Sequence, residues 1–370
     1  MPDSDAGTRA ETVGSLLRDP GVVAAVRRGD PADTEILDRA ARDAISLQEE
    51  IGLDVITDGE VRRVSWAQTP RFLDCFEAME GRAALNWRGG TPGLPGVNGP
   101  VRGYPAVARR VATAARTGDM AADYAFLARH ARTRTKFTLP APSYHRRYWS
   151  EEYSRAAYGS AEEYLTEVRD YVREVVDRLI GLGCDYIQLD APNYGSLCDP
   201  DTRAQLTATG RDLNAELAFD AELDNSLFAG ITGVTTALHI CRGNGPGGAW
   251  HSAGGYGVIS GALFPRLEFS RLLLEYDSDR AGGFEPLADV RPGAVVVLGL
   301  LTTKSGDLDD ESDVTARITE ATKFKPLAEL ALSTQCGFAS VPAENPVTPA
   351  GQRAKLEMVV RLARRTWPGE

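Results

Sequence analysis

The chain has 370 residues, of which 43% are apolar and 25% are charged, and its formal net charge is −11. This composition suffices for a large globular core, and the acidic balance argues against nucleic acid and anionic membranes as partners. The sequence has no apolar stretch near the roughly 18 residues of a transmembrane helix, and Met1–Thr8 lacks the apolar core of a signal peptide. We therefore expect a cytoplasmic protein whose five widely spaced cysteines are free thiols or metal ligands.

Short apolar segments alternate with segments of helical periodicity along the chain. The eight expected strands are Arg9–Val13, Asp54–Thr57, Lys136–Leu139, Tyr186–Leu189, Thr235–Ile240, Leu272–Tyr276, Ala294–Leu300 and Leu330–Ser333. The expected helices include Ala32–Ile51, Ala161–Leu182, Arg211–Ala229, Ala316–Glu329 and Thr348–Thr366. Strand–helix alternation indicates parallel pairing through crossover helices.

Eight such units in a chain of this length predict an α/β protein with one (β/α)8 TIM-barrel domain over residues 1–370. A doubly wound open sheet is the alternative, but its G-x-G-x-x-G fingerprint is absent after the first strand. The interval between the second and third expected strands is too long for one helix, and it contains the Gly- and Pro-rich segment Trp87–Tyr104. Because long loops in compact domains are usually functional, we expect a lid-like insertion around residues 65–130 that covers the barrel mouth or forms an oligomer contact.

Thiol, imidazole and carboxylate side chains lie at the ends of the later expected strands, where (β/α)8 barrels place their chemistry. His239 and Cys241 are two residues apart, so in a strand they point to the same face. Glu275 ends the sixth strand and Cys336 follows the eighth. Imidazole and thiolate are ligands that zinc prefers, so these four residues are candidate Zn²⁺ ligands, with Glu275 as the one that a substrate thiol displaces. The alternative is that His239 and Cys241 are buried neutral core residues and that Cys336 is unrelated to them.

Acidic and hydroxyl side chains at other strand ends are candidate substrate contacts. Glu60 and Asp190 could act as a general acid/base pair or hold a substrate ammonium group, or they could cap the helices that follow. Ser15 could offer its hydroxyl and backbone N–H to a carboxylate, or could be a turn residue. Asn193 follows Asp190, and Trp149 could stack on a ring-containing donor or belong to the core.

The remaining histidines and cysteines are weaker candidates. His251 lies in the Gly-rich segment 243–257, where a mobile or solvated side chain is expected. His145 could line the pocket beside the third strand, and His130 is expected on the surface. We expect buried structural roles for Cys75, Cys184 and Cys198, since a buried thiol packs like a small hydrophobic group.

Together, the strand-end residues resemble those of the cobalamin-independent methionine synthases. The similar motifs are Val13-Gly14-Ser15, Thr57-Asp58-Gly59-Glu60, Gln188-Leu189-Asp190, His239-Ile240-Cys241-Arg242-Gly243-Asn244, Leu274-Glu275-Tyr276-Asp277, Leu298-Gly299-Leu300 and Gln335-Cys336-Gly337-Phe338. The resemblance covers nearly the whole chain, and it is to the C-terminal catalytic barrel in its stand-alone, single-barrel branch. It implies a zinc site of His239, Cys241, Glu275 and Cys336, and homocysteine contacts at Ser15, Glu60 and Asp190.

The resemblance thus implies a Zn²⁺-dependent methyltransferase that moves a methyl group from a methylated folate or corrinoid donor to a thiol, with homocysteine giving methionine. Two features depart from the family pattern. Asp190 is followed by Ala191-Pro192 where the long synthases have a second acid, and the insertion Trp66–Tyr104 does not align. These departures leave open a zinc-dependent alkyl transferase acting on another thiol or electrophile, as in epoxyalkane:coenzyme M transferase.

Two further alternatives do not involve thiol transfer. One is a non-enzymatic barrel that binds a small ligand or partner and holds a structural zinc. The other is a metal-free barrel of the uroporphyrinogen decarboxylase type, against which His239, Cys241 and Cys336 argue.

Overall fold

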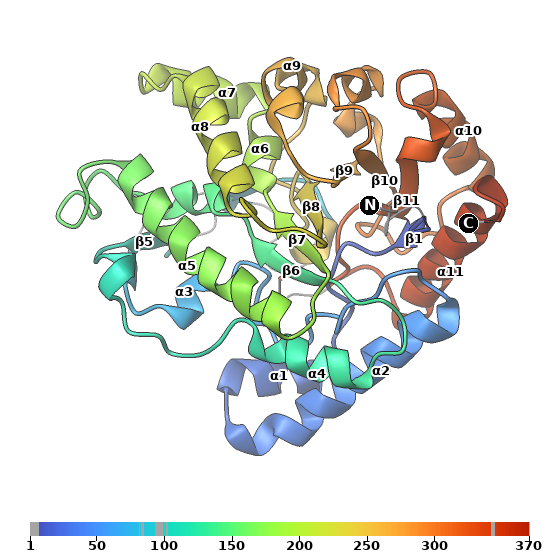
Figure 1. Ribbon diagram of the computed structural model, residues 1–370, viewed down its shortest axis with the longest axis horizontal. Coiled ribbons are helices and arrows are strands. Elements are labelled where there is room, and N and C mark those ends of the chain that lie inside the picture. Colours follow the sequence, from blue (N-terminus) through green and yellow to red (C-terminus); the bar gives the residue numbers. More distant parts are fainter. Residues whose placement is uncertain are drawn as a thin grey trace.

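The computed structural model describes residues 7–80, 82, 85–92, 99–100, 103–341 and 345–369. Its centre is a curled parallel sheet with helices packed around it (Figure 1). The strands of this sheet are β1 (Ala10–Glu11), β6 (Phe137–Pro140), β7 (Tyr186–Asp190), β8 (Thr235–Ile240), β9 (Arg271–Glu275), β10 (Val295–Leu301) and β11 (Leu330–Thr334). Within the described residues these seven strands are ordered β1-β11-β10-β9-β8-β7-β6, and each pairing is parallel. The predicted α/β class and parallel pairing are confirmed.

A segment around Val55 and Ile56 joins the two edges of this sheet. Parallel bridges link Glu11 to Val55 and Ile56 to Thr135. The segment occupies the place of the expected strand Asp54–Thr57, between β1 and β6. It makes only isolated bridges because the Gln48 side chain takes the next hydrogen bonds: Oε1 accepts from the Thr57 amide at 3.1 Å, and Nε2 donates to the Thr57 carbonyl at 2.8 Å.

Alternate residues of the strands divide between two apolar clusters. Leu272 and Leu274 of β9 belong to the large core that packs under the helices, whereas Leu273 belongs to a smaller buried cluster. The smaller cluster takes one residue from each of several strands and lies on the concave face of the sheet; its members are Val13, Val55, Tyr186, Ala237, Leu273, Val297 and Ala331. Side chains therefore fill the interior of the curled sheet.

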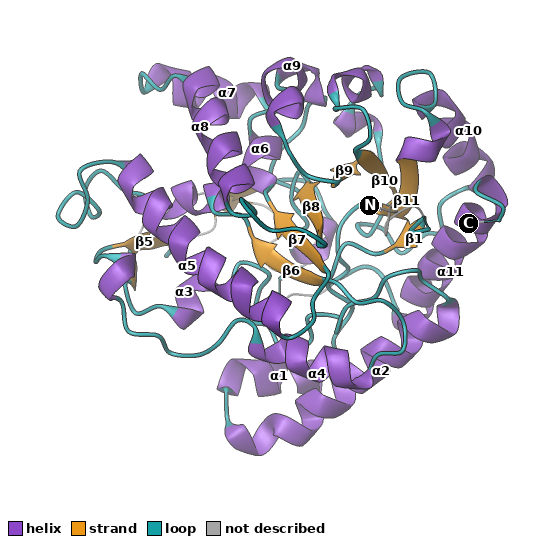
Figure 2. Ribbon diagram, viewed as in Figure 1, coloured by secondary structure: helices purple, strands orange, loops and turns teal. Residues whose placement is uncertain are grey.

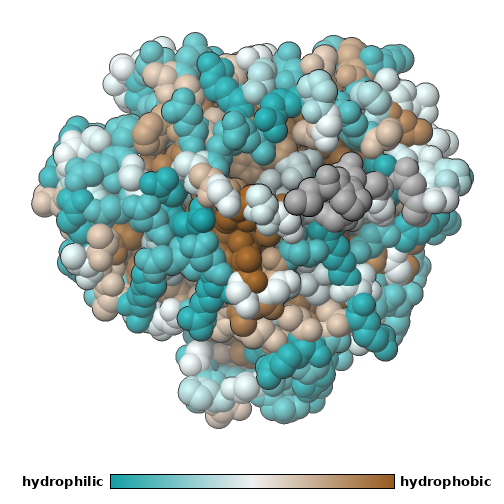
Figure 3. Space-filling model, in the orientation of Figure 1, coloured by the Kyte–Doolittle hydropathy of each residue, from teal (hydrophilic) through white to brown (hydrophobic). Residues whose placement is uncertain are grey.

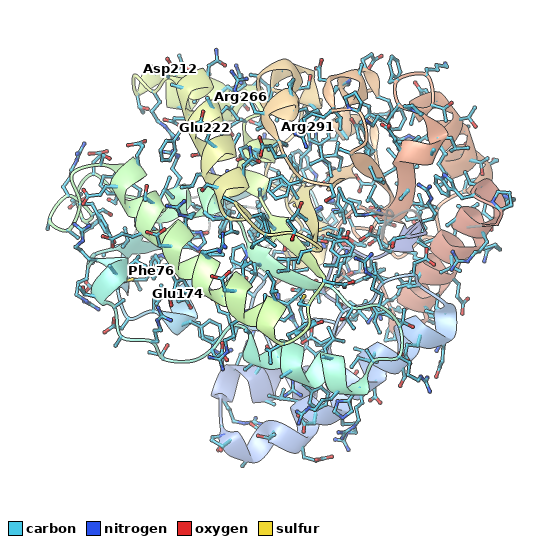
Figure 4. All side chains as sticks on the ribbon, viewed as in Figure 1. Phe76, Glu174, Asp212, Glu222, Arg266 and Arg291 are labelled. Carbon is cyan, nitrogen blue, oxygen red and sulfur yellow. The ribbon has the colours of Figure 1, made fainter. Side chains whose placement is uncertain are left out.

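Helices surround the strands on the outside (Figure 2). The long helices bury an apolar stripe against the sheet and expose polar side chains to solvent. On α5, Val168 and Val172 are buried while Glu174 is exposed at the surface (Figure 4). Figure 3 shows hydrophilic side chains over the helices of this face and hydrophobic ones gathered near its middle. The helices are α1 (Pro20–Arg28), α2 (Thr34–Ile51), α3 (Thr69–Phe72), α4 (Ala122–His130), α5 (Ala161–Gly181), α6 (Pro192–Ser196), α7 (Pro200–Ala208), α8 (Leu213–Ser226), α9 (Ser260–Leu263), α10 (Glu311–Ala321) and α11 (Pro349–Thr366). None of these described helices combines the length and apolar composition needed to cross a bilayer.

The expected helix Ala316–Glu329 was placed too late in the chain. The Asp310 side chain accepts hydrogen bonds from the amides of Ser312 and Asp313, so α10 begins at Glu311. Pro326 disfavours helical backbone at the preceding residue, and a separate 3₁₀ turn follows at Leu327–Glu329. Helix α7 was not predicted, because it buries no residue and has no apolar stripe to recognise.

The long insertion forms two small antiparallel pairs apart from the central sheet (Figure 1, β5). Strand β2 (Phe76–Ala78) pairs with β5 (Pro105–Val107), and β3 (Asn86–Trp87) pairs with β4 (Gly99–Pro100). The backbone of Arg88 exchanges hydrogen bonds of 2.7 and 2.9 Å with that of Trp250, which ties the insertion to the Gly-rich loop after β8. Parts of the expected 65–130 insertion, at 81, 83–84, 93–98 and 101–102, lie outside the described residues.

Candidate functional site

His239, Cys241 and Cys336 come together at the carboxyl ends of β8 and β11. One ligand atom from each of the three lies within 4.8 Å of the other two, and all three residues are buried. His239 is the second-last residue of β8, Cys241 directly follows that strand, and Cys336 follows β11. Two strands that are not neighbours in the sheet thus deliver an imidazole and two thiols to one point.

The imidazole of His239 is fixed in the orientation of a metal ligand. Its Nδ1 lies 3.1 Å from the carbonyl oxygen of Leu273, which only accepts, so Nδ1 carries the proton and donates. Its Nε2 is buried without a hydrogen-bond partner among the described residues. In metal-bound histidines, a hydrogen bond at the nitrogen that does not bind the metal sets the tautomer. It also turns the lone pair of the other nitrogen toward the metal.

The two thiols shift each other's pKa in opposite directions. A hydrogen bond from Cys241, together with the nearby His239, lowers the pKa of Cys336 well below its ordinary value. The same contact raises the pKa of Cys241. The cluster therefore stabilises a negative sulfur at Cys336, which is the state in which a cysteine binds zinc.

The carboxylate of Glu275, predicted as the fourth ligand, lies outside this group of three and is held by cations. Its Oε1 accepts from Arg280 Nη2 at 2.5 Å and from Lys304 Nζ at 3.3 Å, and its Oε2 accepts from the Arg242 amide at 2.7 Å. Burial opposes the charge of Glu275, but Lys304, Arg280 and Arg242 outweigh burial and lower its pKa far below the usual range. A group of three protein ligands is typical of catalytic zinc sites, which keep a further position for substrate.

A cavity of about 490 Å³ lies over the cluster. Ser15, Glu60 and Asp190 line it together with the His–Cys–Cys group, so six of the predicted site residues share one space. Its volume is that of a small-molecule site. Much of the remaining lining is aromatic and comes from the segment after β6 and from the insertion; it includes Trp66, Trp87, Tyr104, Tyr144 and Tyr148.

Glu60 lines the cavity and has a strained backbone conformation. Its φ of 53° is in the left-handed region, which non-glycine residues rarely adopt. Its Oε1 accepts from the Thr138 hydroxyl at 2.7 Å and lies 3.7 Å from Arg63 Nη1. Its Oε2 is buried and has no partner among the residues that the structure describes. This oxygen is available to a substrate ammonium group.

Asp190 and Ser15 complete the polar part of the lining. Asp190 Oδ1 accepts from Gln188 Nε2 at 2.8 Å, and burial, partly opposed by His239, raises the pKa of Asp190 to about 7. Ser15 Oγ accepts from the Ala339 amide at 3.2 Å, which ties the segment after β1 to the loop after β11. A side chain at Gly337 would collide with the Ser15 hydroxyl, so glycine is required at that close approach.

The structure places Asn193 and Trp149 away from the described cavity lining. Asn193 Nδ2 donates to Ser143 Oγ at 3.1 Å. The Trp149 ring stacks on Tyr164, and its Nε1 donates to Glu151 at 2.8 Å. Both side chains connect neighbouring elements of the fold.

The expectation of a solvated His251 is wrong. His251 is buried and lines the cavity, with the Trp87 ring 5.8 Å away. The glycines around it suggested mobility, but they allow close packing: a side chain at Gly243 would collide with His251 and one at Gly245 with Trp87. His145, by contrast, is buried without joining the described lining, and its Nδ1 bonds to the Ala141 carbonyl at 2.9 Å.

Sequence reasoning missed several polar residues of the lining, among them Gln68, Arg147 and Asn244. Asn244 Nδ2 donates to the Gly337 carbonyl at 2.6 Å and so links the loops after β8 and β11. Asn244 ends the motif that begins at His239, and Arg147 lies between His145 and Trp149, but no local signal gave the direction of either side chain.

Comparison with known proteins places the chain in a family. No protein-family model matches the sequence. The Bacillus subtilis protein YxjH, of uncharacterised function, is 33% identical over 374 residues, which span 97% of this chain and 94% of YxjH. The chain belongs to the YxjH family.

Solved structures relate this YxjH-family member to methionine synthases in fold. One, from Listeria monocytogenes, is of a candidate vitamin-B12-independent methionine synthase; it is 26% identical, with a TM-score of 0.69 and 98% of each chain covered. Another is a B12-independent methionine synthase from Shewanella sp. W3-18-1 in complex with selenomethionine, 18% identical, with a TM-score of 0.66 and 97% of each chain covered. The chain therefore has a methionine synthase-like methyltransferase fold.

Proposed function

We propose that the protein is a zinc-dependent S-methyltransferase that moves a methyl group from a methylated folate or corrinoid donor to a thiol, with homocysteine as acceptor and methionine as product. The observation that carries this proposal is the unpartnered Nε2 of His239 beside the thiols of Cys241 and Cys336, on the floor of the cavity. One nitrogen and two sulfurs fit zinc better than magnesium or calcium, which prefer oxygen. The fold shared with methionine synthases supports the same reaction class.

The residues of the chain have separate roles in this proposal. Zinc held by His239, Cys241 and Cys336 would supply the positive charge that keeps a substrate sulfur deprotonated at neutral pH. Glu60 Oε2 and Asp190 receive the substrate ammonium group, and the Ser15 hydroxyl faces its carboxylate. The aromatic walls exclude water and hold the donor close to the sulfur, so catalysis depends on proximity and orientation.

We also propose that the sheet and the bridging segment at Val55 together form a (β/α)8 barrel and that the insertion is its lid. Val55 belongs to the interior cluster, as a barrel strand requires. Trp87 of the insertion lines the cavity, and Arg88 beside it is bonded to the loop after β8. The proposed partners are small molecules, with no nucleic acid or membrane.

The test compares two cysteine variants by zinc content and methyl transfer. Cys336→Ala removes a proposed ligand, so bound zinc should be lost and methyl transfer to homocysteine should fall by at least about 100-fold. Cys198→Ala is the matched control, because Cys198 is also buried but lies outside the group of three; it should keep its zinc. Purified protein without zinc, or full activity in Cys336→Ala, would contradict the proposal.

The acceptor is identified by X-ray absorption at the zinc edge. Homocysteine should add a sulfur neighbour to zinc, whereas methionine, which has no thiol, should not. Zinc whose environment changes with another thiol, but not with homocysteine, would favour the alkyl transferase alternative.

A further inference from the structure

Two consecutive arginines after β6 have opposite surroundings. Both lie in the 3₁₀ helix η3 (Ser143–Tyr148). Arg146 is paired with carboxylates: its Nη2 lies 2.5 Å from Asp220 Oδ1 and its Nη1 lies 3.1 Å from Glu162 Oε1. Arg147 lines the cavity and forms no ion pair with any residue that the structure describes. Among the described residues, its Nη2 donates to the Ser196 hydroxyl at 3.4 Å, and its Nη1 is buried without a partner.

A buried guanidinium nitrogen without an acceptor is costly, and a native fold keeps one chiefly where a ligand supplies the acceptor. The Arg147 guanidinium is braced on the Tyr144 ring, 5.5 Å from its centroid. The bracing fixes the direction of the side chain but satisfies no N–H. The unpaired charge is therefore held toward the cavity by an aromatic side chain.

Gln68 presents a second unused donor on the same wall. Gln68 is 5% exposed, lines the cavity, and its Nε2 has no partner among the described residues. The backbone N–H of Gln68 donates to the Trp66 carbonyl at 3.1 Å. The Trp66 ring lies 4.5 Å from the Tyr144 ring on which Arg147 rests. Arg147 and Gln68 thus belong to one continuous wall that offers hydrogen-bond donors.

Other parts of the lining offer acceptors. Glu60 Oε2 and Asn244 Oδ1 are both buried without a donor among the described residues. The cavity therefore has places for a cationic group at its acceptors and a place for an anionic group at its donors. A planar carboxylate matches the two N–H directions of a guanidinium.

We propose that Arg147, together with Gln68, is an anion-binding site of this cavity and positions a carboxylate or similar anionic oxygen group of a substrate. The identity of that substrate rests on the proposed function, in which two molecules carry such a group: an amino-acid thiol and an acidic methyl donor. The same positive charge disfavours a cationic donor such as a sulfonium.

The first experiment measures anion binding without reference to catalysis. Thermal unfolding is followed with and without millimolar sulfate at constant ionic strength for the zinc-loaded wild type, for Arg147→Gln, and for Arg155→Gln. Arg155 is the control because its side chain is exposed, pairs with Glu151 and lies outside the cavity lining. Sulfate should raise the unfolding temperature of the wild type and of Arg155→Gln, but not of Arg147→Gln.

An equal sulfate effect in Arg147→Gln and the wild type would overturn the inference. Without sulfate, Arg147→Gln should unfold no earlier than the wild type, because the structure gives Arg147 no ion pair to lose. A marked fall of its unfolding temperature would assign Arg147 a structural role instead. Since neither readout needs turnover, both remain decisive if the protein proves not to transfer methyl groups.

The second experiment identifies which substrate carries the anion. If the acceptor does, Arg147→Gln should bind homocysteine about 10- to 100-fold more weakly, while 3-aminopropane-1-thiol, which lacks the carboxylate, should bind both proteins equally. If the donor does, the KM for 5-methyltetrahydrofolate should rise by that factor, while methylation by uncharged methyl iodide is unchanged. Unchanged values for both substrates would contradict the inference.

Discussion

At the scale of single residues, the site depends on side chains held in conformations that their own preferences disfavour. Glu60 sits at positive φ, and Gly14 leaves room for its carboxylate, because a side chain at Gly14 would collide with that group. Strain of this kind costs about 1–3 kcal/mol and persists where the surrounding structure fixes it. Here the Thr138 hydroxyl and Arg63 fix one carboxylate oxygen and leave the other for a ligand.

Glu60→Gln tests this arrangement with almost no change of shape. The amide cannot compensate an ammonium charge, so the KM for homocysteine should rise by about 10- to 100-fold. The KM for 4-mercaptobutanoate, which has the carboxylate and thiol but no amine, should stay the same. Steady-state kinetics with the two thiols provides the measurement, and a parallel loss for both would exclude an amine contact at Glu60.

At the scale of elements, the Arg88 side chain adds to the backbone contacts that attach the insertion to the loops after β7 and β8. The Arg88 guanidinium pairs with the buried Asp199, donates to the His251 carbonyl at 2.6 Å and lies over the Trp250 ring. The hairpin residue Trp87 beside it is packed against Gly243 and Gly245 of the loop after β8. These contacts set the position of the cavity wall that the insertion provides.

Arg88→Gln should loosen this wall. Hydrogen exchange at residues 86–91 should speed up and the KM for substrate should rise, while global unfolding changes by no more than about 1–3 kcal/mol, since the main core is untouched. Arg109→Gln is the control in the same insertion, because its pair with Glu77 is exposed and contributes little. Unchanged exchange in Arg88→Gln would show that the insertion is held elsewhere.

At the scale of the whole molecule, a buried charge network links distant parts of the curled sheet. Glu11 of β1 accepts from Lys136 Nζ at 2.6 Å and from Arg271 Nη2 at 2.8 Å, and all three side chains are fully buried. Burial opposes the charge of Glu11, but Lys136 and Arg271 outweigh it and lower the pKa of Glu11 to about 2. The network joins β1 to β9 and to the residue before β6.

The pKa of Glu11 predicts an acid-dependent loss of stability. Because the folded pKa lies below the unfolded value of 4.5, this contribution is present above about pH 4.5 and is lost as the pH falls toward 2. The shift corresponds to about 3 kcal/mol. Urea unfolding at about pH 6 and about pH 3 should show about 2 kcal/mol of this loss in the wild type and a smaller loss in Glu11→Gln.

Glu11→Gln should also be less stable by about 3–5 kcal/mol at neutral pH, since two buried cations lose their carboxylate. Glu77→Gln, which removes an exposed carboxylate, serves as the control and should keep the pH dependence of the wild type. An equally steep acid loss in Glu11→Gln would assign the effect to other carboxylates.

The sequence alone located most of the sheet and the centre of the site. Strand β8 was predicted at its observed limits, and the limits of α2, α5 and α11 were predicted within two residues. These elements are predictable because the spacing of apolar residues along the chain follows the period of a buried strand or an amphipathic helix. His239 and Cys241 were recognisable as a pair because residues two apart in a strand share a face, which is a local property.

Only the tertiary structure decided what surrounds each side chain. Arg146 and Arg147 are adjacent and chemically identical, yet one is paired with Asp220 and the other is held on Tyr144 toward the cavity. Glu275 ends its strand as expected, and the structure pairs its carboxylate with Arg280 and Lys304 and leaves it outside the group of three. Past a strand end the backbone no longer fixes the side-chain direction, so contacts between residues far apart in the chain determine it.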